Sequence, residues 1–311
     1  MNNQLANFLE LINEEIDQHE VSGQPQSLYD PINYILSIGG KRMRPLLVLL
    51  AYHIFDNDTK WAVKKSILTE FFHNFTLMHD DIMDQAPLRR GKPTIHEKWD
   101  TPTAILSGDV MLVKCYDYFL DLDPDKIAEG IKMFNKAASE VCEGQQLDMI
   151  FENSEGVTEE MYIQMIKQKT GALLGFSMRY GAFLANADDE DQQHLQQAGE
   201  DLGIGFQIKD DLLDVYGTES FGKQKGGDII ANKKTYLLIK ALKNANGNEL
   251  QQLKQWLTVK DFVPQEKIDA VTTIYDNLGI KETTNKTMNN YFQNALNSID
   301  MVKGQKESIG L

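Results

Sequence analysis

Apolar residues recur at three- and four-residue spacing along most of the chain, which is the pattern of amphipathic helices. One such stripe comprises Leu5, Phe8, Leu9 and Ile12, and another comprises Leu195, Leu202, Phe206 and Leu213. No convincing run of strictly alternating apolar residues is found. The pattern therefore predicts an all-α protein with about ten or more helices of ordinary length.

Short turn signals separate the predicted helices, among them Gly39-Gly40, Gly91-Lys92-Pro93 and the segment from Asn244 to Asn248. None of these segments is long enough, or biased enough in composition, to be a linker between domains. We therefore expect a single domain over residues 1–311.

The charge balance narrows the classes of function. The chain has 31 Lys and Arg against 46 Asp and Glu, a formal net charge of −15, which disfavours binding to a nucleic-acid backbone. Its two cysteines cannot form a disulfide framework.

The first residues lack the features of a signal peptide, and the longest apolar stretch, Pro45 to Phe55, is too short to span a bilayer. These features predict a cytoplasmic protein.

One acidic cluster occurs twice. Asp80, Asp81 and Asp84 recur in the same spacing as Asp210, Asp211 and Asp214, each time next to apolar helical sequence. Carboxylates four residues apart share a helix face, where they repel one another unless a cation lies between them. A single cluster of this kind is commonly only an acidic surface. Two copies near basic motifs predict metal ligands, and ligation by oxygen alone favours Mg²⁺.

Basic motifs lie close to these clusters in the sequence. Lys41, Arg42 and Arg44 follow two glycines at a predicted helix start, a natural anion site. Arg89 and Arg90 come just after the first cluster and can grip phosphate oxygens. A glycine- and lysine-rich segment and Lys233 follow the second cluster. Metal and cations together suit a diphosphate substrate.

The order of these motifs resembles that of the trans-isoprenyl diphosphate synthases, the polyprenyl synthetase family, of the short-chain type. The resemblance covers Gly39 to about Leu238 and rests on the following segments, in this order: Gly39 to Pro45, His79 to Asp84, Arg89 to Thr94, Ser107 to Asp109, Glu143 to Gln145, Lys169-Thr170, Phe206 to Asp214, Gly222-Lys223, Asp228, and Lys233 to Thr235. It implies one helical bundle around a central apolar tunnel, and a homodimer. The implied reaction is the Mg²⁺-dependent, head-to-tail condensation of isopentenyl diphosphate with dimethylallyl, geranyl or farnesyl diphosphate.

The resemblance also implies roles for individual residues. Asp80, Asp84 and Asp210 would hold three Mg²⁺ ions, with Asp81, Asp211 and Asp214 in support. The allylic diphosphate would be bound by Arg89, Lys169, Thr170, Gln207 and Lys233, and isopentenyl diphosphate by Lys41, Arg44, His73 and Arg90. Of these, Asp80, Asp81, Asp84, Lys169, Asp210 and Lys233 would be catalytic. Residues Lys223 to Asp228 would form a lid that excludes water.

Product length is expected to depend on the helix that carries the first cluster. Phe75 lies about 7.5 Å before Asp80 along a helix axis, and Phe72 lies nearly one turn further back. A bulky Phe75 beside a small Thr76, without an insertion in the cluster, resembles geranylgeranyl diphosphate synthases. The expected product is therefore geranylgeranyl diphosphate (C20), with farnesyl diphosphate (C15) as the alternative.

Two departures from the family pattern stand out. Asn232 precedes Lys233, where a glycine is frequent, and the tail Lys303 to Leu311 lacks the strongly basic ending of some farnesyl synthases. Neither removes a predicted metal ligand.

Two other functions are disfavoured. A class I terpene cyclase would not need the Gly39 to Pro45 motif or Arg90 for a second diphosphate. A non-catalytic partner subunit should have lost one aspartate cluster, and this chain keeps both.

Overall fold

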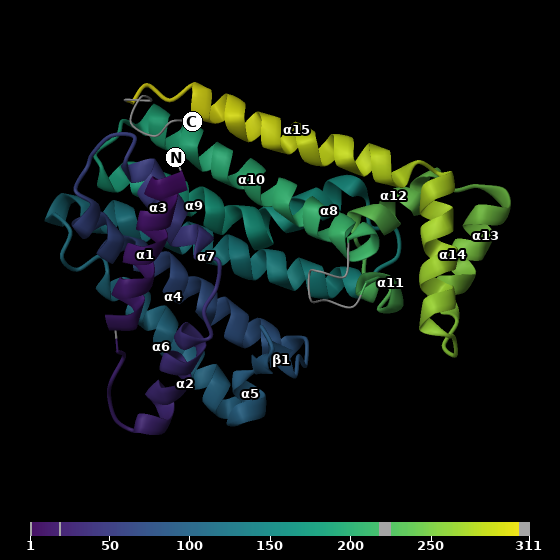
Figure 1. The fold of residues 1–311 in the computed structure, drawn as a ribbon, viewed down its shortest axis with the longest axis horizontal. Helices are drawn as coiled ribbons and strands as arrows, with labels where there is room; N and C mark the ends of the chain where they lie inside the picture. Colours follow the sequence, from purple (N-terminus) through teal and green to yellow (C-terminus); the bar gives the residue numbers. More distant parts are fainter. Residues whose placement is uncertain (1, 19, 218–224, 305–311) are drawn as a thin grey trace. The chain divides into compact units, whose positions relative to one another are not determined.

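The computed structural model describes residues 2–18, 20–217 and 225–304, and the described chain is mostly helical, with only two short strands (Figure 1). The helices are α1 Asn2–Gln18, α2 Gln26–Ser37, α3 Met43–Tyr52, α4 Thr59–Met83, α5 Ile95–Lys98, α6 Thr101–Asp117, α7 Pro124–Glu152, α8 Glu159–Ile166, the π-helical turn η1 Lys167–Gly171, α9 Ala172–Leu184, α10 Asp189–Tyr216, α11 Gly227–Ile230, α12 Tyr236–Asn244, α13 Gly247–Thr258, α14 Pro264–Asn277 and α15 Ile280–Asp300. Two strands, β1 Leu88–Arg89 and β2 Lys92–Pro93, form a small antiparallel hairpin. The prediction of an all-α fold is confirmed.

The chain divides into two compact units. The first unit comprises Met1–Lys136, Phe176–Gln196 and Val302–Leu311, and the second comprises Ala137–Gly175 and Gln197–Met301. The expectation of a single domain over residues 1–311 stays a prediction. No helix among the described residues is long and apolar enough to cross a membrane.

The first unit is organised around α4, the helix that carries the first aspartate cluster. The side chain of Asp58 caps its start by accepting from the Trp61 amide at 3.3 Å. Apolar side chains along α4 are buried, and α4 packs mainly against α6 and α3. A group of aromatic rings lies beside it, in which Phe134 contacts both Phe72 and Phe176. This packing fixes the end of α4 where the acidic cluster lies.

The second unit carries the second aspartate cluster on the last turns of α10. Its core joins α10 to α11, α12, α13, α14 and α15 through the buried side chains of Leu212, Val215, Ile229, Leu237, Leu238, Ala241, Leu253, Ile268, Val271, Ile274, Tyr275 and Ile280. The hydroxyl of Thr235 caps α12 by accepting from the Leu238 amide at 3.3 Å. The segment that leads into α12 is therefore fixed at its end and contains Lys233.

Candidate active site

The first aspartate cluster lies at the C-terminal end of α4. Asp80 and Asp81 belong to the last turn, and the Asp84 amide donates to the Asp80 carbonyl at 2.8 Å. The three carboxylates differ in environment. Asp81 is only 2% exposed, whereas the Asp80 side chain is 22% exposed and Asp84 is exposed. Asp80 and Asp84 are therefore the carboxylates that a bound ion can reach.

The buried carboxylate of Asp81 is held by Arg89. Nε of Arg89 lies 2.8 Å from Oδ1 and 2.9 Å from Oδ2, and a terminal nitrogen of the guanidinium lies 2.6 Å from Oδ1. Arg89 comes from the β1–β2 hairpin, whose turn residues Arg90 and Gly91 both have positive φ, as a tight hairpin requires. Burial by itself would lower the pKa of Arg89, but Asp81 and Asp80 raise it above its usual value. The hairpin is thereby fastened to the acidic cluster.

Arg42 is structural, although it belongs to a motif that predicts anion binding. It adopts a left-handed conformation at the start of α3, with φ of 49°, and its side chain is buried. One guanidinium nitrogen lies 2.6 Å from Oε1 of Glu70, and another donates to the Leu36 carbonyl at 2.9 Å. The only sign of this pair in the sequence is an acidic residue, Glu70, within the apolar part of α4. Arg42 therefore holds the motif in place rather than facing substrate.

Three of the residues predicted to bind isopentenyl diphosphate share one positive region of the first unit. Burial, opposed by Glu70 and aided by the nearby Arg90, lowers the pKa of Arg44 to about 10. Burial also lowers the pKa of His73 well below its usual range, and Arg44 and Arg90 act in the same direction. His73 is thus neutral at pH 7. The buried Nε of Arg44 has no hydrogen-bond partner among the described residues, so it can serve an anion.

The two glycines of the motif bring Arg90 to the same region. A Cβ on Gly40 would lie 2.8 Å from a terminal nitrogen of Arg90, so a larger residue there would displace the guanidinium. Gly39 has a φ of +85°, which also favours glycine. Lys41, the fourth predicted residue, lies exposed directly after this pair.

The second aspartate cluster repeats the contrast within the first. Asp210 is exposed, Asp214 is half-buried and Asp211 is 3% exposed. Oδ2 of Asp211 accepts from the Tyr162 hydroxyl at 2.6 Å and from the Tyr236 amide at 2.9 Å. Burial raises the pKa of Asp211 to about 7 despite these hydrogen bonds. A cation nearby would favour its ionised form.

Asp214 fixes the segment that follows the second cluster. Its Oδ2 accepts from the Asp228 amide at 3.1 Å, and its carbonyl accepts from the Gly226 amide at 2.8 Å. The predicted lid runs from Lys223 to Asp228. Gly222, Lys223 and Gln224 lie outside the described residues, so only Lys225 to Asp228 can be placed. Lys233 is exposed, and its amide donates to the Asp228 carbonyl at 2.9 Å.

Lys169 and Thr170 lie in the π-helical turn η1, a local geometry often found at functional sites. The Lys169 ammonium lies 2.7 Å from Oδ2 of Asp148, and the Thr170 hydroxyl donates to Oε1 of Gln207 at 3.4 Å. Because Gly144 has no side chain, α7 can approach η1 closely. A Cβ at Gly144 would lie 2.2 Å from the backbone nitrogen of Lys169. The structure thus brings together three residues predicted to bind the allylic diphosphate.

The aspartate carboxylates can be compared with the ligands that a magnesium ion requires. Within the described parts of the chain, no group of three or more His, Cys, Asp or Glu side chains could hold a metal ion. Mg²⁺ usually takes one or two carboxylates and completes its shell with water and substrate phosphate. The accessible pair Asp80 and Asp84, and the exposed Asp210, are hard oxygen donors of this kind. These residues fit such an ion when a diphosphate is also present.

The residues predicted to set product length differ in their packing. Phe72 is fully buried, with ring centroids 5.5 Å from Phe75 and 5.2 Å from Phe134. Phe75 is 7% exposed and contacts the His79 ring at 4.8 Å. The Thr76 hydroxyl donates to the His73 carbonyl at 2.8 Å. Phe75 therefore lies nearer the acidic end of the helix, while Phe72 belongs to the aromatic core.

Sequence reasoning missed several residues that support the site. Tyr162 and Asp148 lie outside every motif, and no sequence signal marks them. Gly108 belongs to one of the motifs that carry the family resemblance, Ser107 to Asp109, but the sequence alone indicates no role for it. In the structure a Cβ on Gly108 would lie 2.5 Å from Nε2 of His79, so the glycine lets α6 lie close to α4.

Comparison with known proteins shows which sequences and structures the chain is similar to. The sequence profile of the family described as polyprenyl synthetase matches residues 25–276. The chain is 40% identical to the geranylgeranyl pyrophosphate synthase of Geoglobus acetivorans over 243 residues, 78% of this chain and 76% of that protein. It is 38% identical to the short chain isoprenyl diphosphate synthase of Methanocaldococcus jannaschii over 267 residues, 85% and 81% of the two chains.

Solved structures agree with these sequence relatives. A crystal structure of a geranylgeranyl pyrophosphate synthase superposes with a TM-score of 0.92 at 41% identity, covering 100% of this chain and 95% of that one. That of the geranylgeranyl pyrophosphate synthetase of Pyrococcus horikoshii superposes with a TM-score of 0.90 at 30% identity, covering 99% and 95%. The chain therefore belongs to the polyprenyl synthetase family of trans-prenyltransferases, as the order of its motifs predicts.

Proposed function

We propose that the protein joins isopentenyl diphosphate head-to-tail to dimethylallyl, geranyl or farnesyl diphosphate, in the presence of Mg²⁺, and releases geranylgeranyl diphosphate. The names of the relatives support this product. The observation that carries the proposal is the presence, in the first unit, of both a cationic region around His73 and accessible carboxylates at the end of α4. A protein that bound only one diphosphate would not need both the cationic region and the carboxylates.

Isopentenyl diphosphate is proposed to bind at Lys41, Arg44, His73 and Arg90. The arginines keep their charge at neutral pH and can make bidentate hydrogen bonds to phosphate oxygens. His73 is neutral because burial and the neighbouring arginines lower its pKa, so it acts as a hydrogen-bond donor rather than as a charge. This set neutralises the substrate while leaving its double bond free to react.

The allylic diphosphate is proposed to bind at Arg89, Lys169, Thr170, Gln207 and Lys233. Asp80, Asp84 and Asp210 would hold the Mg²⁺ ions, three by family resemblance, which neutralise the charge that develops on the departing pyrophosphate. Asp81, Asp211 and Asp214 support these residues through their own hydrogen bonds. Asp81 orients Arg89, and Asp211 and Asp214 hold both ends of the segment that contains Lys233.

The reaction needs little else from side chains. When the carbon–oxygen bond of the allylic substrate breaks, its allylic carbon becomes a cation. The double bond of isopentenyl diphosphate attacks that carbon, and the departed pyrophosphate takes the proton that is lost. The protein contributes by binding both diphosphates, orienting them and excluding water from the cation.

Product length is proposed to depend on Phe75 and Thr76, with Phe72 behind them. Phe75 presents its ring near the acidic end of α4, where a growing apolar chain would meet it. Farnesyl diphosphate is the alternative product. In that case growth of the prenyl chain would stop one isoprene unit earlier.

We also propose that residues 1–311 act as one domain, since residues of both units are assigned to the same reaction. A homodimer and a cytoplasmic location are further parts of the proposal, and the family resemblance supports them.

One experiment tests the core of the proposal. The purified protein is incubated with Mg²⁺, labelled isopentenyl diphosphate and each allylic diphosphate in turn, and the products are separated by chain length. Incorporation that ends at C20 is expected. A C15 endpoint would replace only the product assignment, whereas no incorporation with any allylic substrate would overturn the proposed reaction.

A further inference from the structure

The turn before Lys233 has an unusual backbone conformation. Asn232 has a φ of 56°, in the left-handed region that favours glycine and tolerates asparagine next best. The asparagine therefore adopts a conformation that glycine would also allow, and it adds a side chain. Both the amide nitrogen and the oxygen of that side chain make hydrogen bonds. Nδ2 donates to the Leu257 carbonyl at 3.1 Å, and Oδ1 accepts from the Lys267 ammonium at 2.7 Å.

Lys267 is a buried lysine that lies outside every motif. It sits on α14, is 1% exposed, and also donates to the Ile230 carbonyl at 3.2 Å. Its ammonium lies 4.4 Å from the centroid of the Phe262 ring. Among the described residues, no carboxylate contacts it. A buried cation without an opposite charge is costly for stability, so a purely structural role explains it poorly.

The segment from Asp228 to Tyr236 is anchored at both of its ends and at the turn between them. The Asp228 amide donates to Asp214 at one end, and the Tyr236 amide donates to Asp211 at the other. Both of these anchors belong to the second aspartate cluster. The pair of Lys267 and Asn232 supplies the third anchor, on the opposite side of the turn.

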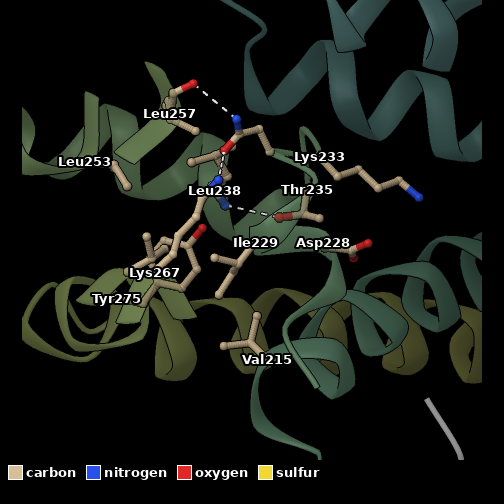
Figure 2. A pocket seen from close by; sticks show the side chains of 12 residues that line it. Val215, Asp228, Ile229, Lys233, Thr235, Leu238, Leu253, Leu257, Lys267 and Tyr275 are labelled. Carbon is tan, nitrogen blue, oxygen red and sulfur yellow. Dashed lines mark hydrogen bonds between the residues drawn. The ribbon is translucent and has the colours of Figure 1, made fainter. Parts of the chain in front are cut away.

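The surroundings of the third anchor are tightly packed. Figure 2 shows Lys267, Tyr275 and Leu253 on one side of the turn, while the Lys233 side chain extends away from them. The cavity between these residues has a volume of only about 10 Å³, which is enough for one water molecule. The turn can therefore shift little on this side as long as the Lys267 contacts are made.

We propose that Lys267 is a positioning residue for Lys233: by holding Asn232 in its left-handed conformation, it fixes the direction in which Lys233 points toward the allylic diphosphate. This inference rests on the proposed function, which assigns Lys233 to that diphosphate. Lys267 itself touches neither substrate. Its effect on the reaction runs through two residues, Asn232 and Lys233, whose contacts define the test.

The first test is a double-mutant cycle on the full-length protein with Mg²⁺, isopentenyl diphosphate and farnesyl diphosphate. Lys267→Met should lower kcat by about tenfold or more, because small misplacements of a substrate-binding group are costly. The KM for isopentenyl diphosphate should change less than twofold. In a Lys233→Ala background, Lys267→Met should have no further effect on kcat. Effects that multiply in the double variant would overturn the inference.

The second test separates the hydrogen bond from the backbone conformation. Asn232→Gly keeps the left-handed turn but removes both the acceptor for Lys267 and the donor to the Leu257 carbonyl, and it should lower kcat at least as much as Lys267→Met does. Asn232→Asp also loses the donor to Leu257 but keeps an acceptor for Lys267, so it isolates the Lys267 contact and should stay within about threefold of the parent. If Asn232→Gly has full activity, the third anchor does not matter to the reaction. Lys254→Met, an exposed lysine on the neighbouring helix α13, is the matched control and should change nothing.

A third measurement does not depend on turnover. Amide hydrogen exchange at residues 229–235 should be faster in Lys267→Met than in the parent, while exchange in α4 stays the same. Unchanged exchange at 229–235 would overturn the inference even if the parent protein were inactive. An inactive parent with faster exchange in the variant would instead overturn the proposed reaction and keep the anchor, so the two failures are distinguishable.

Discussion

Arg89 spans both carboxylate oxygens of Asp81, with its Nε 2.8 Å from one and 2.9 Å from the other. The pair joins the β1–β2 hairpin to the last turn of α4 at a point where Asp81 is buried. The two adjacent aspartates of the cluster therefore have different tasks. Asp81 maintains the geometry, and the more exposed Asp80 is the one proposed to hold an ion.

The first prediction separates these tasks by substitution. Asp81→Asn should lower the free energy of unfolding by about 2–4 kcal/mol, because it removes the carboxylate that is hydrogen-bonded to the partly buried Arg89 guanidinium. Asp80→Asn should change stability by less than about 0.5 kcal/mol but lower kcat about a hundredfold or more. Urea unfolding and steady-state kinetics of both variants check this. Equal losses of stability in the two variants would contradict the division of tasks.

A second prediction concerns Gly144 and the π-helical turn. Gly144→Ala places a Cβ 2.2 Å from the Lys169 nitrogen, a distance that forces α7 and η1 apart. Stability should fall by about 2–3 kcal/mol, and the KM for the allylic diphosphate should rise because Lys169 and Thr170 are displaced together. The exposed Gln146→Ala on the same helix serves as the control. A Gly144→Ala variant with parental stability and KM would show that the close approach is not needed.

Much of this organisation was predictable from the sequence, and the reasons why some of it was not are physical. Helical periodicity and motif order identify α4, α10 and the aspartate clusters, because these depend on local spacing. The inward direction of Asp81 and Asp211 depends instead on packing between elements distant in sequence. Tyr162, which bonds Asp211, lies 49 residues before it. Lys267 would be taken for a surface residue from sequence, because lysine is almost never fully buried.

The third prediction is a dependence of stability on pH. Burial would raise the pKa of Glu159, but hydrogen bonds from Lys240, Lys243 and Tyr236 outweigh it and lower the pKa to about 2. The folded state thus binds the Glu159 proton more weakly than the unfolded state does. The resulting stability is fully present above the usual glutamate pKa and is lost as the pH falls from about 5 to 2.

Glu159→Gln isolates this contribution. At pH 7 the variant should be less stable than the parent by about 2–3 kcal/mol, and the difference should shrink toward zero near pH 2. Thermal unfolding of both proteins across this range provides the measurement, and Glu155→Gln, an exposed residue shortly before α8, is the control. A stability difference that does not vary between pH 7 and pH 3 would assign the contribution to some other interaction.

The last prediction concerns product length. Phe75 and Phe72 are both candidates for the residue that stops chain growth, but their surroundings differ. Phe72 lies between Phe75 and Phe134 in the aromatic core and is fully buried, so Phe72→Ala should cost about 3–5 kcal/mol of stability. Phe75 lies one turn closer to the acidic cluster, against the His79 ring.

Phe75→Ala should therefore change the product more than Phe72→Ala does. Removing the ring frees apolar space near the acidic cluster, so products longer than C20 should appear while the rate of the first condensation stays within about threefold. Chain-length analysis of products made from farnesyl diphosphate and labelled isopentenyl diphosphate distinguishes the outcomes. If Phe75→Ala keeps the parental product and Phe72→Ala lengthens it, the stop lies in the aromatic core. If neither lengthens it, chain growth is limited elsewhere and the assignment to this helix is wrong.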